Sequence, residues 1–145
     1  MTSAELQEAI ARAQHDLRNP LGHVLGFCEM LLYHVEPLPP NDIREAVEGI
    51  YQVSEQMLRE MDRVLDPDKP PALPEEVNAL KSQLQKKAST VLNALPDLLA
   101  KASLPDNVAF GQDVARIAEA ADRFAALIPI KLSFFSDVGK AHDDE

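Results

Sequence analysis

Apolar residues recur at intervals of three or four along four long stretches of the sequence. This spacing follows the 3.6-residue turn of an α-helix, so each stretch predicts a helix with one buried side. Four such helices in one chain predict an all-α fold, an antiparallel four-helix bundle. The residues expected on the four buried sides are Leu6, Ile10, Ala13, Leu17, Leu21, Val24, Cys28 and Leu31; Ile43, Val47, Ile50, Ser54, Met57, Met61 and Val64; Val77, Leu80, Leu84, Ala88, Val91, Leu95 and Leu98; and Phe110, Val114, Ile117, Ala121, Phe124 and Ile128.

Segments that contain proline divide the chain into two helical hairpins. We expect one helical domain over residues 1–145, with a hairpin at 3–66, a proline-rich linker at 67–74, a second hairpin at 75–132 and a tail at 133–145. The helices are expected to begin near Ser3 (a candidate N-cap), Asn41 or Asp42 (either of which can cap the second helix), Pro74 or Glu75, and Asp106 or Asn107. The first should reach about Val35 and the second Asp66, while Pro96 should kink the third and Pro129 should end or bend the fourth.

The two hairpins align with each other when the sequence is shifted by 67 residues. This shift pairs Leu17 with Leu84, Val24 with Val91, Val47 with Val114, Ile50 with Ile117 and Leu65 with Leu132. One offset thus serves both helices of each hairpin and the turn between them. Two explanations stay open: a duplicated hairpin, or apolar registers that any two hairpins of similar length share.

His15 is the first candidate for chemistry, because it lies two residues from both Ala13 and Leu17 and should point away from the buried side. A neutral imidazole is a nucleophile near physiological pH and can hold a phosphoryl group. Asp16, next in the sequence, is placed to orient the ring or to accept the proton of its other nitrogen. Asn19 follows one turn later on the same outward side.

Gly22 and Gly26 continue this outward side, although glycine in a helix interior costs about 1 kcal/mol against alanine. A functional reason would be that small residues beside His15 let the backbone of another protein approach. The alternative is simple tolerance in a well-packed helix.

The stretch from His15 through Pro20, Leu21 and Gly26 to Leu32 resembles the phosphoacceptor box of sensor histidine kinases. In that family the box lies on the first helix of the dimerisation and histidine phosphotransfer (DHp, or HisKA) hairpin, and two chains pair as a four-helix bundle. The resemblance implies that the Asp16 position assists phosphorylation, and that the Asn19 position orients water for removing phosphate from a partner response regulator.

The same resemblance implies a docking surface for a response-regulator receiver domain. We expect it to include His15, Asn19, Gly22 and Gly26, with the facing part of the second helix. The remaining residues of the expected surface are Arg18, which would support the phosphoryl charge, His23, Gln56, Arg59 and Arg63.

The second hairpin lacks the box, since the shift of 67 places Ser82 opposite His15 and Gln83 opposite Asp16. Four helices in one chain would imitate the bundle that family members make by dimerising. We therefore expect a monomeric pseudo-dimer, with an ordinary homodimer as the alternative.

The sequence has no glycine-rich phosphate loop and no pattern for the α/β domain with which histidine kinases bind ATP. We expect no autonomous kinase activity and no bound cofactor, with ATP and Mg entering only through a separate kinase domain, in trans or in a longer parent chain. The four histidines form no close cluster, so no metal site is expected. Three functions stay open: a phosphotransfer module of a phosphorelay, a non-catalytic regulatory or scaffold bundle, and the DHp fragment of a longer kinase.

Charge and hydropathy limit the partners. Fourteen basic and twenty-four acidic residues give a net charge of −10, which argues against a nucleic-acid surface. No apolar run approaches the ~20 residues of a membrane span, and the first residues lack a signal-peptide pattern. We expect a cytoplasmic protein, unless the chain is a piece of a larger receptor. The one cysteine, Cys28, lies on a buried side and has no internal partner.

Overall fold

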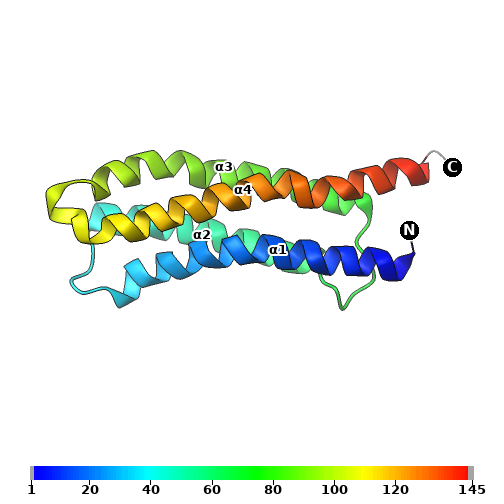
Figure 1. Ribbon diagram of the computed structural model, residues 1–145, viewed down its shortest axis with the longest axis horizontal. Coiled ribbons are helices and arrows are strands. Elements are labelled where there is room, and N and C mark those ends of the chain that lie inside the picture. Colours follow the sequence, from blue (N-terminus) through cyan, green and yellow to red (C-terminus); the bar gives the residue numbers. More distant parts are fainter. Residues whose placement is uncertain (1, 144–145) are drawn as a thin grey trace.

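The computed structural model describes residues 2–143, and within this range it contains four long α-helices and no strand. Figure 1 shows the helices lying side by side in antiparallel order, with α1 beginning and α4 ending at the same end of the bundle. The predicted all-α four-helix bundle is thus confirmed. The elements are α1 (Ser3–Glu29), a π-helical turn (Met30–His34), α2 (Asn41–Val64), α3 (Pro74–Ala102), a 3-10 turn (Pro105–Asn107) and α4 (Val108–Asp143).

The helices form a closed ring in which each packs on two neighbours. Helix α1 packs on α2 and α4, and α3 packs on the same two helices from the other side. Consequently α1 and α3 occupy opposite corners of the bundle, as do α2 and α4. The first hairpin (α1 and α2) therefore buries its apolar sides against the second (α3 and α4).

The core consists of the predicted apolar sides. All the residues expected there are buried except Leu6 and Val64, which are half-buried and pack against the core. Each buried apolar residue of the first hairpin except Pro20 and Leu32 has a buried counterpart 67 residues later, as Ile43 has in Phe110 and Met61 has in Ile128. The two hairpins thus bury corresponding positions, so they enter the common core in the same register.

Two predicted helix caps were wrong. Helix α1 is capped by Thr2, whose hydroxyl accepts a hydrogen bond from the Glu5 backbone N–H at 3.1 Å, so Ser3 already belongs to the helix. At α2 the capping position is Pro40, which offers no side-chain acceptor. The proline-rich segment before α2 already has an extended backbone there, so the helix begins one residue earlier than a polar cap would place it.

Helix α4 continues through Pro129. The sequence predicted that this proline would end or bend the helix, and the predicted end is wrong. A proline inside a helix loses a backbone hydrogen bond, at a cost of about 3 kcal/mol. Ile128 and Leu132 on either side are fully buried, and burying each side chain contributes about 2 kcal/mol. Packing therefore carries the helix through Pro129, so the segment predicted as a tail from 133 begins inside α4. Its last two residues, 144 and 145, lie outside the described residues.

Candidate functional site

His15 lies on the outer side of α1, and its side chain is 83% exposed. Its neighbours Ala13 and Leu17 are buried in the core. Because successive helical residues are rotated by about 100°, a residue midway between two buried positions must face outward. The predicted exposure of His15 is confirmed, and the imidazole can be reached from solvent.

Asp16 joins His15 to the opposite hairpin. Its Oδ1 lies 3.4 Å from His15 Nδ1, and its Oδ2 lies 2.9 Å from Nζ of Lys131 on α4. The hydrogen bond from Lys131 lowers the pKa of Asp16 more than partial burial raises it, and the contact with His15 lowers it further. Asp16 is therefore ionised at neutral pH. A carboxylate beside Nδ1 favours the tautomer with its proton on Nδ1, which leaves the Nε2 lone pair free.

Lys131 is the site residue that the sequence analysis missed. It follows Pro129, where the sequence predicts that the fourth helix ends or bends, so the sequence alone gives Lys131 no position relative to α1. A usable signal was present, because the buried spacing of α4 continues from Ile128 to Leu132. An unbroken helix through these residues brings Lys131 against Asp16.

Arg18 is turned toward α2. Its Nη2 lies 3.7 Å from Oδ2 of Asp62, while Gln14 donates a hydrogen bond of 2.9 Å to Oδ1 of the same carboxylate. These contacts fix the position of α2 along the axis of α1. The turn of α2 that carries Arg59 and Arg63 consequently lies next to the turn of α1 that carries His15.

The remaining residues of the expected docking surface are all exposed. They are Asn19, Gly22, His23 and Gly26 on α1, and Gln56, Arg59 and Arg63 on α2. The structure thus gathers the expected surface on two adjacent helices.

The two glycines beside His15 have no partner inside the chain. A Cβ atom built on Gly22 or Gly26 meets no atom within 4 Å, and neither glycine has a positive φ angle. Neither close packing within the chain nor backbone geometry therefore requires glycine there. The two explanations given by the sequence, approach of a partner backbone and simple tolerance, both remain compatible with this open space.

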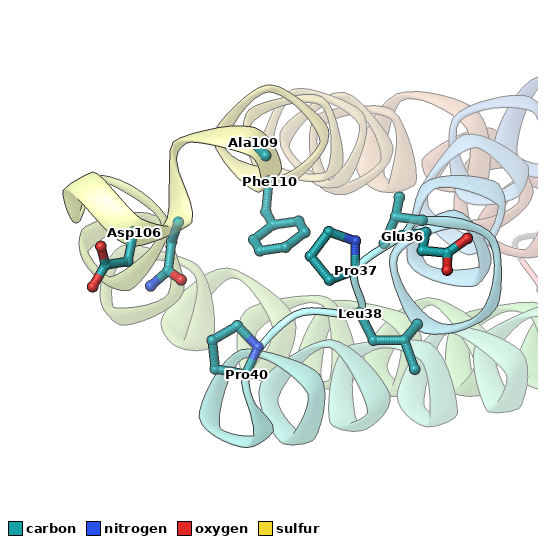
Figure 2. Close-up of a pocket in the computed structure, with 9 residues that line it drawn as sticks. Glu36, Pro37, Leu38, Pro40, Asp106, Ala109 and Phe110 are labelled. Atoms are coloured by element: carbon teal, nitrogen blue, oxygen red, sulfur yellow. The ribbon is translucent and has the colours of Figure 1, made fainter.

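A cavity of about 470 Å³ lies at the far end of the bundle, between the segment that follows α1 and the start of α4. Figure 2 shows the Phe110 ring facing Pro37 across it, with Leu38 and Pro40 on the same segment. At 1.5 Å per helical residue this segment is about 30 Å from His15 along α1. The exposed His15 face and this cavity are thus separate.

Among the described residues, no group of three or more histidine, cysteine, aspartate or glutamate side chains is placed to hold a metal ion. Over the same part of the chain, no helix has both the length and the apolar character needed to cross a membrane.

The first hairpin matches a known family model. Residues 5–72 match the family model of the His Kinase A (phospho-acceptor) domain, a range that holds α1, α2 and most of the linker and stops before α3. Searches against curated proteins and against solved structures found no match. The first hairpin, with His15 on its exposed side, therefore matches the His Kinase A (phospho-acceptor) domain of two-component signalling, as the phosphoacceptor box predicted.

Proposed function

We propose that this chain is a histidine phosphotransfer module of a two-component system. His15 exchanges a phosphoryl group with an aspartate of a response-regulator receiver domain, or accepts one from a kinase domain in trans or in a longer parent chain. The observation that carries the proposal is an exposed histidine paired with an ionised carboxylate, within the hairpin that matches the phosphoacceptor family.

In the proposed transfer, the lone pair of neutral His15 Nε2 attacks phosphorus. The bond between phosphorus and the leaving oxygen breaks, and that oxygen, of an aspartyl phosphate or of ADP, keeps the electron pair. Positive charge develops on the ring, whose Nδ1 proton is held by Asp16, and the carboxylate stabilises that charge. Asn19, one turn away, is proposed to orient water when phosphate is removed from the partner.

The open site needs a partner to complete it. The side chain of His15 is 83% exposed, so the site is open to solvent on the outer side of α1. ATP and Mg would be supplied by a separate kinase domain. The proposed docking surface includes the exposed arginines Arg18, which is paired with Asp62, Arg59 and Arg63, and we propose that these arginines contact acidic groups of the partner.

The proposal includes a monomeric chain. Helices α3 and α4 cover the apolar sides of α1 and α2, the sides that family members bury by dimerising. Pairing with a second chain would then have little apolar surface left to bury. Light scattering on a size-exclusion column should give about 16 kDa, the mass of one chain. A mass of twice that value would favour the homodimer.

The first experiment is mass spectrometry at neutral pH on protein isolated from its native cells, with a search for acid-labile phosphate. We expect phosphate on His15, its loss in His15→Ala and its retention in His34→Ala, which removes an exposed histidine outside the proposed docking surface. If a phosphohistidine standard survives the procedure and His15 carries no phosphate, the regulatory bundle becomes the better function. In that case His15→Ala should leave cellular activity unchanged.

A second experiment tests the docking surface. The protein, phosphorylated chemically with phosphoramidate, is mixed with purified receiver domains of the source organism, and transfer is timed. Gly22→Leu and Gly26→Leu should slow transfer more than they affect unfolding, whereas Gly49→Leu on α2, which also has open space around its Cβ position, should leave it unchanged. Normal transfer by folded Gly22 and Gly26 variants would contradict this surface.

A further inference from the structure

The second hairpin contributes a charged group to the His15 site. The Asp16 carboxylate is shared between Lys131 Nζ of α4, at 2.9 Å, and His15 Nδ1 of α1, at 3.4 Å. The Asp16 and Lys131 side chains are each only 31% exposed, so this ion pair is better shielded than most surface pairs. It is a contact between the hairpin that matches the phosphoacceptor family and the hairpin that lies outside the match.

The corresponding position on the other side of the bundle holds no such pair. A shift of 67 residues relates Asp16 to Gln83 and Lys131 to Val64. Gln83 and Val64 also lie together, since both line one shallow pocket between α3 and α2. The bundle thus brings these positions together twice, but only the pair beside His15 is charged. General support of the bundle does not require an ion pair at this position.

We propose that Lys131 is a positioning residue for the phosphoacceptor site, holding one oxygen of Asp16 so that the other faces His15 Nδ1. This inference rests on the proposed function and deepens it, because it makes the second hairpin a part of the site. Lys131 touches neither the imidazole nor the phosphoryl group and acts only through Asp16. With Oδ2 engaged, Oδ1 is kept beside the ring and holds the proton on Nδ1, so that Nε2 stays free to attack phosphorus.

Lys131 also determines whether Asp16 acts as a hydrogen-bond acceptor or as a base. The hydrogen bond from Lys131 lowers the pKa of this carboxyl, which makes the carboxylate a weaker base. Asp16 consequently accepts a hydrogen bond from Nδ1–H and does not remove the proton. The phosphorylated ring keeps its positive charge and remains a good phosphoryl donor.

The test uses the full chain with three substitutions. Lys131→Met removes the charge at similar length, and Lys131→Arg restores a charged donor. Lys101→Met is the matched control, because Lys101 is 32% exposed and pairs with Asp97 at 3.1 Å, near the end of α3 that is far from His15. Lys131→Gln serves as a second charge-removing variant if Lys131→Met does not fold.

Two measurements are made on each variant. The ¹⁵N chemical shifts of the His15 imidazole, recorded above pH 8, report the tautomer without any phosphoryl chemistry. The rate at which phosphoramidate phosphorylates His15 reports reactivity. We expect Lys131→Met to lower the Nδ1–H tautomer population and to slow phosphorylation about fivefold, as loss of a partly shielded ion pair would. Lys131→Arg should recover most of both effects, and Lys101→Met should match the unaltered protein.

The outcomes separate this inference from the function on which it rests. If Lys131→Met changes neither the tautomer nor the rate, Lys131 is not a positioning residue, while phosphorylation of His15 still supports phosphotransfer. If the unaltered protein takes no phosphate, phosphotransfer fails, but the ¹⁵N shifts still decide whether Lys131 positions Asp16. In an Asp16→Asn background, Lys131→Met should have no further effect, and an undiminished effect there would overturn the inference.

Discussion

Replacing the two exposed glycines of α1 with alanine should make the protein more stable. Gly22 and Gly26 lie inside a helix, and their built Cβ atoms meet nothing within 4 Å. Alanine should therefore stabilise the helix by about 0.5–1 kcal/mol at each position, because its helix propensity is higher and its Cβ meets no other atom. The double variant should gain about 1–2 kcal/mol in free energy of unfolding. For a chain of this size that is a rise in melting temperature of roughly 3–6 °C.

Urea denaturation followed by circular dichroism at 222 nm measures this gain directly. Gly49→Ala, on α2, is the matched control because its Cβ position is equally open, and it should give a similar increase. Gly111→Ala should gain less, since its Cβ would lie 3.4 Å from the Ala102 carbonyl oxygen. Loss of stability in Gly22→Ala or Gly26→Ala would refute the reasoning, because it would mean that the folded chain itself requires glycine there.

Three further predictions concern other parts of the bundle. Ser54→Ala should raise the free energy of unfolding by about 1 kcal/mol in urea denaturation, because the fully buried hydroxyl has no hydrogen-bond partner among the described residues; a loss would indicate a hidden partner. Burial raises the pKa of the Cys28 thiol to about 12, so Ellman's reagent should react with Cys28 at pH 8 only after the protein unfolds. Fast reaction of the folded protein would contradict the packing around Cys28. The hydrogen bond that Tyr51 donates to Glu29 at 3.0 Å raises the pKa of the Tyr51 phenol to about 12. In Glu29→Gln, a titration followed by absorbance at 295 nm should therefore give a phenol pKa closer to 10.0. An unchanged titration would contradict the contact. Since the folded pKa is the higher one, the stability from this contact is complete below pH 10.0 and is lost as pH rises through about 12.

The alternation of buried and exposed residues could be predicted well because it is a local property. His15 is exposed for the same reason that Leu17 is buried, namely its angular position on one helix. The correspondence of the two hairpins under a shift of 67 follows from the same periodicity, repeated in each. The starts of α1 and α2 at Ser3 and Asn41 agree with the prediction, but their caps do not, because neighbouring residues can cap a helix about equally well.

The sequence by itself determined the four helices, their buried sides, the outward position of His15 and the resemblance of the first hairpin to a phosphoacceptor domain. Tertiary structure alone decided that α1 lies between α2 and α4, that Arg18 contacts Asp62 and that Lys131 holds Asp16. The physical reason is the distance along the sequence over which each feature is determined. A helix face is set by residues within a few turns of each other, whereas a contact between helices depends on the register in which the whole core packs. Lys131 reaches Asp16 only because burial of Ile128 and Leu132 carries α4 through Pro129.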